Sequence, residues 1–217
     1  MNRALIELQF LPSIEYFCAL SSCQEIILEK HENFLKQSYR NRCHILTTHA
    51  VGRLSIPLTA KHGKVAITAV QIDYSHPWQR NLWRTLLSSY AKSPYFEHYA
   101  DELHRELFSK EKFLFDLNRR LLSMCLKWLQ WDQSVSESLG YEKQYADTIV
   151  DIRNVISSKN DYLHRSFYQP HAYQQVFGSK FVPNLSVIDL VCCMGPEAGT
   201  IIKLSQRKIE QIKQKLC

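Results

Sequence analysis

The residue types needed for acid–base chemistry and for anion binding are concentrated in one polar segment, residues 29–43. Either Glu29 or His31 would accept a proton from a substrate if its pKa is suitable. The cations that follow suit a phosphate group: Lys36, Arg40 and Arg42. The same composition also fits a solvent-facing loop with a few turn hydrogen bonds, because polar loops are common and also carry most functional sites.

The elements before this segment would place it at the edge of a sheet. Residues 4–9 are typical of a strand, and residues 26–28 are typical of a second strand. Between them, Ser13 can cap a helix that runs to Leu20. This order of elements favours a parallel pair joined by a crossover helix. In open α/β sheets, ligands bind beyond the carboxyl ends of such strands.

These strand ends define the predicted site. Gln9 ends the first strand and Glu29 ends the second, so both residues would lie at the same edge of the sheet. We predict a cleft there in which Glu29 and His31 are catalytic. The substrate would be bound by Gln9, Asn33, Lys36, Arg40 and Arg42. No metal ligand is predicted, because the histidines are scattered.

Arg40 and Arg42 have two interpretations. In an extended segment, side chains two residues apart point the same way, so both arginines could bind one anion. Alternatively, either arginine pairs with a carboxylate such as Asp189 or Glu197 and ties the C-terminal helices to the sheet. The sequence leaves both interpretations open.

Downstream of this segment the pattern changes from strand-like to helical near residue 77. Residues 43–46 and 53–58 flank a turn and predict a hairpin, and residues 65–72 predict a further strand. Between Trp78 and Trp131, apolar residues then recur at three- and four-residue spacing in three stripes. This spacing predicts a lobe of three helices.

The last third of the chain is less regular. Residues 148–152 are typical of a strand, and the remainder of 134–183 is typical of loop and turn. Ser186 can cap a short helix that Gly195 ends, and Pro196 can open a last helix to Leu216. The sequence therefore predicts a mixed α/β (α+β) fold in one domain, with a mixed sheet in 1–76, a helical lobe in 77–131, and an irregular segment with C-terminal helices in 132–217.

Composition favours an ordered, cytoplasmic protein. The chain has 217 residues, of which 45% are hydrophobic, and no apolar run reaches the length of a signal peptide or membrane span. Its seven cysteines form no CxxC pair, so we expect free thiols and no structural metal. The net charge of +6 favours anionic partners, although a solvated basic face would carry the same charge.

Sequence motifs of several well-known sites are absent from the chain. It contains no GxxxxGK[ST], GxGxxG, HExxH or GxSxG pattern, and no two aspartates are separated by one residue. These absences argue against P-loop, dinucleotide, zinc-peptidase and serine-hydrolase sites. The sequence indicates no particular cofactor and no oligomeric state.

A set of short motifs extends over most of the chain. In order, they are Leu11-Pro12-x-x-x-Tyr16-Phe17, His31-Glu32-Asn33-x-x-Lys36-Gln37-x-Tyr39-Arg40-Asn41-Arg42, Ser55-Ile56-Pro57-Leu58, Tyr90-x-x-x-Pro94-Tyr95-Phe96 and Pro183-Asn184-Leu185-Ser186-x-x-Asp189-Leu190. Together they resemble the WbqC-like protein family, most closely its shorter Bacteroides-type branch.

The resemblance implies a role in the chemistry of bacterial surface sugars. The family is named from gene clusters for O-antigen and related polysaccharides, and its members are candidates for transferring groups on activated sugars. This chain departs from the family pattern at two places. The common His-Gln-Pro start reads Leu8-Gln9-Phe10, and residues 147–168 lack the Gly-rich turn. A catalytic step that needs either feature would be lost.

Two classes of function follow. The first is a group-transfer enzyme of O-antigen-type polysaccharide biosynthesis, acting on a phosphorylated or nucleotide-linked sugar. The second is a non-catalytic binding module for nucleic acid or another polyanion, which basic charge with interleaved aromatic residues permits. The first class is favoured, because the sequence shows no known nucleic-acid-binding motif and its polar segment is compact.

Overall fold

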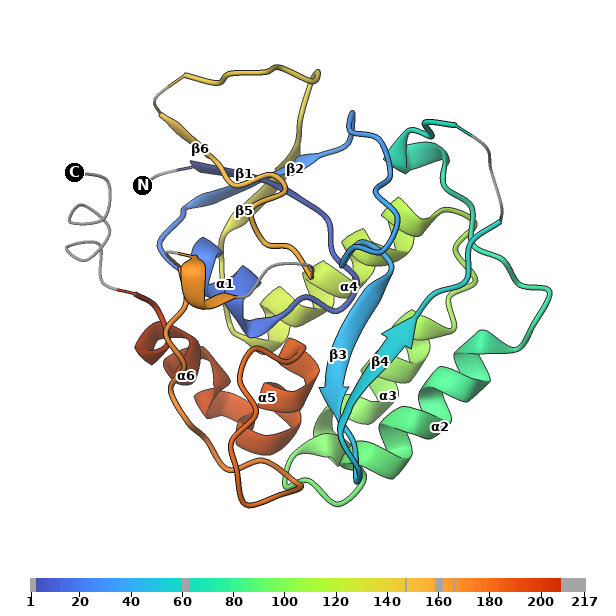
Figure 1. The fold of residues 1–217 in the computed structure, drawn as a ribbon, viewed down its shortest axis with the longest axis vertical. Coiled ribbons are helices and arrows are strands. Elements are labelled where there is room, and N and C mark those ends of the chain that lie inside the picture. Colours follow the sequence, from blue (N-terminus) through green and yellow to red (C-terminus); the bar gives the residue numbers. More distant parts are fainter. Residues whose placement is uncertain (1–2, 60–62, 147, 159–161, 166, 208–217) are drawn as a thin grey trace.

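Two β-sheets organise the computed structural model, which describes residues 3–59, 63–146, 148–158, 162–165 and 167–207 (Figure 1). The larger sheet is parallel throughout, and its strands in spatial order are β5 (Ser134–Glu137), β2 (Glu25–Glu29), β1 (Arg3–Glu7) and β6 (Ile149–Asp151). The smaller sheet is an antiparallel hairpin of β3 (Arg42–Leu46) and β4 (Val51–Ser55). The predicted mixed α/β fold is confirmed, with the parallel and antiparallel strands in separate sheets.

The predicted strand–helix–strand unit forms the centre of the larger sheet. β1 and β2 are parallel neighbours, and their register places Glu7 beside Glu29. The crossover is α1 (Ile14–Leu20). Successive residues of β1 from Ala4 to Ile6 are fully buried, which requires cover on both faces of the strand. The crossover prediction is confirmed, and the carboxyl ends of β1 and β2 meet at one edge.

The outer strands of this sheet come from much later in the chain. β6 confirms the strand predicted at residues 148–152 and pairs with β1. β5 pairs with β2 in a register that places Ser134 beside Glu25, although its sequence, Ser-Val-Ser-Glu, predicts irregular structure. Half of β5 is exposed, so it has little apolar pattern, and its pairing with the distant β2 defines it.

The helical lobe predicted at residues 77–131 is confirmed as α2 (Trp78–Tyr90), α3 (Phe96–Leu107) and α4 (Leu114–Trp128). Each helix buries one apolar stripe, which in α2 includes Leu82 and Leu86. Figure 1 shows α2 beside the β3–β4 hairpin. One continuous hydrophobic core joins the lobe to the parallel sheet.

The strand predicted at residues 65–72 is wrong. This segment contains a short 3-10 helix, Ile67–Ala69, with isolated bridges on either side. The three bridges reach Asn33, Leu58 and Phe113, which belong to different segments of the chain. An alternating pattern forms a strand only when one partner strand runs beside it, and the described residues provide none here.

The C-terminal helices begin as predicted, but the last one ends early. Ser186 caps α5 (Val187–Met194), and its side chain accepts a main-chain N–H hydrogen bond at 3.3 Å. Gly195 ends α5 with a φ of 53°. The last helix, α6 (Ala198–Leu204), stops well before the predicted end at Leu216.

The apolar face predicted for the last helix is present only in part. Ile201 and Ile202 are buried, whereas Leu204 is 55% exposed. The helix ends because Ser205 turns the chain, and its carbonyl accepts a hydrogen bond from the Gln169 N–H at 2.8 Å. The remaining residues of the predicted face lie outside the described residues: Ile209, Ile212 and Leu216.

Six of the seven cysteines lie in the described residues, where all six are buried and unpaired. In the same part of the chain, no group of three or more His, Cys, Asp or Glu side chains is placed to hold a metal ion. None of the helices found there is long and apolar enough to span a membrane.

The conformation of Gly195 generates a first prediction. A Cβ atom added there would lie 2.5 Å from the Tyr95 ring, and φ is in the left-handed region. We expect Gly195→Ala to lower the free energy of unfolding by about 2 kcal/mol or more in urea titrations. Gly140→Ala is the matched control, because no atom lies within 4 Å of its added Cβ. Equal effects of the two substitutions would contradict this account.

Asp189 of α5 generates a second prediction. It is fully buried and accepts hydrogen bonds from the Tyr90 hydroxyl at 2.9 Å and the Tyr173 hydroxyl at 2.6 Å. Burial raises the pKa of this carboxyl, although the hydrogen bonds oppose the shift. The folded state therefore binds the proton more tightly than the unfolded state does. This contribution to stability is complete below the ordinary aspartate range and is lost as the pH rises through the raised pKa.

We therefore expect the wild-type protein to lose stability, relative to Asp189→Asn, as the pH rises above about 4. Urea titrations at several pH values would measure this difference. Asp101→Asn provides the control, since Asp101 is exposed on α3. Parallel pH profiles for wild type and Asp189→Asn would show that burial does not perturb this carboxyl.

Candidate functional site

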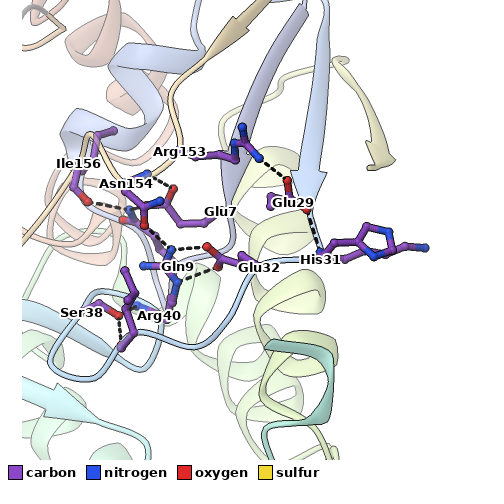
Figure 2. A network of polar contacts seen from close by, with 12 residues as sticks. Glu7, Gln9, Glu29, His31, Glu32, Ser38, Arg40, Arg153, Asn154 and Ile156 are labelled. Atoms are coloured by element: carbon purple, nitrogen blue, oxygen red, sulfur yellow. Dashed lines mark hydrogen bonds and ion pairs between the residues drawn. The ribbon is translucent and has the colours of Figure 1, made fainter. Parts of the chain in front are cut away.

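The carboxyl ends of β1 and β2 meet in a polar network, which Figure 2 shows. Glu7 ends β1 and Glu29 ends β2, whereas Gln9 lies two residues beyond its strand. These three side chains are buried, with at most 1% exposure. The sheet edge that was predicted to open a cleft is filled by side chains that bind one another.

Arg40 and Glu32 form the centre of this network. Arg40 Nε donates to Glu32 Oε1 at 2.7 Å, and a second bond joins Arg40 Nη2 to Glu32 Oε2. Arg40 Nη2 also donates to Asn154 Oδ1 at 2.8 Å. The charged side chains are only 4% and 6% exposed, and burial raises the pKa of the Glu32 carboxyl while the guanidinium opposes that shift. Removing either partner would leave a buried charge uncompensated.

Asn154 and Gln9 extend the network to β1. The Asn154 N–H donates to Glu7 Oε2 at 2.8 Å. Gln9 Nε2 donates to Glu7 Oε1 at 3.1 Å and to the Ile156 carbonyl at 3.3 Å. Asn154 has a φ of 60°, a conformation that asparagine adopts more readily than most residues. The network therefore connects the segment after β2 to the segment after β6.

Glu29, which was predicted to be catalytic, is fully buried and fully hydrogen-bonded. Its Oε1 accepts from the His31 N–H at 2.8 Å and from the Ser138 hydroxyl at 2.7 Å. Its Oε2 accepts from Arg153 Nη1 at 2.8 Å, and that guanidinium lies 4.5 Å from the centroid of the Tyr141 ring. These partners leave Glu29 no exposed oxygen with which to contact a substrate.

The other predicted residues have different surroundings. His31 is exposed, and its Nε2 lies 3.1 Å from the Ser138 carbonyl oxygen. Asn33 is exposed and does not take part in the network. Lys36 and Arg42 line a separate cavity. The predicted site residues therefore divide into a buried network and a separate cavity wall.

Arg40 and Arg42 do not share one binding point. Arg40 is buried in the network, whereas Arg42 lines the cavity. Within the described residues, neither arginine forms an ion pair with Asp189 or Glu197. The carboxylate that Arg40 binds is Glu32, only eight residues away. Arg40 therefore has a structural ion pair of the kind considered above, but within its own segment.

A cavity of about 780 Å³ lies between β4 and the start of α2. Four basic side chains line it: Lys36, Arg42, Arg53 and His76. No Asp or Glu from the described part of the chain belongs to its wall. Apolar and amide side chains complete the lining, including Phe34, Trp78, Leu82, Gln37, Asn41 and Asn81. This combination favours an anionic ligand that also has an apolar or ring-shaped part.

Local structure explains how these side chains come together. In the hairpin, Arg42 lies directly opposite Ser55, and Arg53 is two residues from Ser55 on the same strand face. On α2, the lining residues follow the three- and four-residue spacing of one helix face: Trp78, Asn81, Leu82 and Thr85. Lys36 is contributed by the segment that Arg40 anchors.

Three buried polar atoms of lining residues have no hydrogen-bond partner among the described residues: Arg42 Nε, Trp78 Nε1 and Asn41 Oδ1. Two of them are donors and one is an acceptor. Each unpaired buried group costs about 1–3 kcal/mol, which a ligand bonding to it would recover. Their concentration among the residues of one cavity is a second indication that a ligand binds here.

The predicted site residues did not include Arg53, His76 or Trp78. Arg53 belongs to a strand of the predicted hairpin, and strand alternation together with the hairpin register places it on the face of Arg42. That relation could have identified it. His76 and Trp78 have no comparable local signal, because only the packing of α2 beside β4 brings them to the cavity.

The contrast between Arg40 and Arg42 generates a third prediction. We expect Arg40→Ala to lower the free energy of unfolding by about 3–5 kcal/mol, because Glu32 would remain buried without its cation. Arg42→Ala, in the half-buried cavity wall, should change stability by less than about 1 kcal/mol. Urea denaturation of both variants measures this. Similar losses for the two variants would show that Arg42 also has a structural role.

Comparisons with known proteins identify the family. The sequence model of the WbqC-like protein family matches residues 9–166. The chain is also 25% identical over 230 residues to the uncharacterized protein Rv1507c of Mycobacterium tuberculosis (strain ATCC 25618 / H37Rv), an alignment that covers 92% of this chain and 96% of that relative. No solved structure matches the chain significantly. The chain belongs to the WbqC-like protein family, as its motifs predicted.

Proposed function

We propose that this protein is a group-transfer enzyme of bacterial surface-polysaccharide biosynthesis, and that it binds a phosphorylated or nucleotide-linked sugar in the basic cavity. The observation that supports the proposal most is the charge of the wall, which has four basic side chains and no acidic residue from the described part of the chain. Phosphate is the anionic group that all activated sugars of this kind share. The family resemblance supports the sugar part of the proposal.

The dimensions and chemistry of the cavity also fit such a ligand. Small-molecule sites usually have volumes of about 300–1,000 Å³, and this cavity has about 780 Å³. Phe34 and Trp78 offer apolar ring surface, while Gln37 and Asn81 offer amide groups for sugar hydroxyls. An extended polyanion would be expected to follow a basic face rather than a cavity between a strand and a helix.

The proposal assigns different roles to the residues of the cavity and of the network. Arg42 and Arg53 hold the phosphate, since a guanidinium group can bind two of its oxygens at once. His76 contributes the imidazole ring of the cavity wall and is the residue to which we assign proton transfer. Glu29 and His31 lie outside the cavity lining. Glu29 is buried in the network, so a predicted catalytic role remains only for His31, which is exposed, on a second substrate bound beside it.

A thermal-shift screen tests the proposal and generates a fourth prediction. Nucleotide sugars and sugar phosphates would be compared with short DNA and RNA. We expect at least one of the small ligands to raise the melting temperature, because a ligand at 100 times its Kd stabilises the folded state by about 2.7 kcal/mol. Stabilisation by DNA or RNA alone, with a steep dependence on salt, would instead favour the polyanion-binding module.

Variants of the cavity wall show where the ligand binds. We expect Arg42→Ala and Arg53→Ala each to abolish most of the thermal shift. Arg84→Ala is the matched control, because Arg84 is exposed on α2 and does not line the cavity. A full thermal shift in both cavity variants would exclude this cavity as the binding site.

A further inference from the structure

The outer edge of β4 presents main-chain groups that no described residue binds. The Ile56 N–H donates to the Asn41 carbonyl at 2.9 Å, and this bond sets the phase of the hairpin ladder. Residues 52 and 54 therefore direct their N–H and C=O groups toward β3. Arg53 and Ser55 direct theirs away from β3, where the described residues offer them no partner.

The outer edge of β3 differs, because it is occupied. The His44 carbonyl accepts a hydrogen bond from the Ser186 N–H at 2.7 Å. The Leu46 N–H donates to the Tyr90 hydroxyl at 3.2 Å. The β3 edge of the hairpin is therefore bonded to α2 and to the residue that precedes α5. The β4 edge is the one left open by the described residues.

The open edge of β4 faces the basic cavity. Arg53 and Ser55 line the cavity together with Leu54, although strand alternation directs the side chain of Leu54 to the opposite face. Lining residues from both faces of the strand fit a cavity that extends along the strand's edge. Figure 1 shows α2 on the side of β4 away from β3, and Trp78 and Leu82 of α2 form the opposite wall.

The open part of this edge is short. Pairing resumes just beyond it, where the Pro57 carbonyl accepts from the Asp73 N–H at 3.0 Å. An added peptide strand needs a longer row of main-chain groups to gain useful affinity. A planar ligand needs only two. The Arg53 C=O and the Ser55 N–H are neighbours on the edge, and they offer one acceptor and one donor side by side.

We propose that this edge binds the base of a nucleotide. A nucleobase presents a hydrogen-bond donor and an acceptor side by side on one rim, which complements the Arg53 C=O and the Ser55 N–H. Arg42 lies directly opposite Ser55, so its guanidinium stands close to the base and can take the attached phosphate. The inference rests on the proposed function and adds to it that the sugar is linked to a nucleotide.

Binding to the wild-type protein tests the inference without a variant. Isothermal titration calorimetry would compare uridine, guanosine, cytidine and adenosine diphosphates with inorganic pyrophosphate. We expect at least one nucleoside diphosphate to bind about tenfold more tightly than pyrophosphate, which two hydrogen bonds can supply. Equal affinities would overturn the base site and leave the proposed phosphate site standing. If none of these ligands binds, both proposals fail.

Two substitutions at residue 55 isolate the main-chain N–H. Ser55→Pro removes this N–H and disturbs no ladder bond, because the group points away from β3. Ser55→Ala changes the same side chain and retains the N–H. We expect Ser55→Pro to lose the tenfold preference for the nucleotide and to keep its affinity for pyrophosphate, which also reports correct folding. The same preference in both variants would overturn the proposed base contact.

Discussion

Three carboxylates, those of Glu7, Glu29 and Glu32, are buried in one region at the carboxyl edge of the parallel sheet. The fold can hold them there only because Arg40 and Arg153 supply compensating charge through hydrogen bonds of 2.7–2.8 Å. A buried ion that lacks its partner costs several kcal/mol. The chain that follows β2 is therefore held in one conformation, since another conformation would separate the buried carboxylates from these cations.

That constraint also forms the basic cavity. The main-chain carbonyl of Arg40 accepts a hydrogen bond from Asn118 Nδ2 of α4 at 2.7 Å, so Arg40 is anchored to the sheet and to the helical lobe at once. With Arg40 directed inward, Lys36 before it and Arg42 after it line the cavity. One short segment thus supplies a buried cation for structure and accessible cations for ligand binding. The buried network positions the residues to which we assign ligand binding.

Periodicity in the sequence was sufficient for elements whose apolar pattern is local, such as α2, α3, α4 and the crossover unit. It failed for β5 and for residues 65–72, because contacts with distant segments decide those structures. Residue types also singled out a segment that contributes Lys36 and Arg42 to the cavity wall. They could not show that Arg40 turns inward, because that depends on Asn154, which lies 114 residues further along. The cavity itself exists only once α2 packs beside β4.

The order of strands in the parallel sheet has a consequence for how the chain folds. The hydrogen bond from Ser134 to Gln24 joins residues that are 110 positions apart, and the whole helical lobe lies between them. During synthesis, β1 and β2 leave the ribosome long before β5 and β6 exist to cover their edges. Contacts of such long range form slowly, and unpaired strand edges invite association with other chains. The nascent N-terminal third is therefore the part of this protein that most needs protection by chaperones until its last strands arrive.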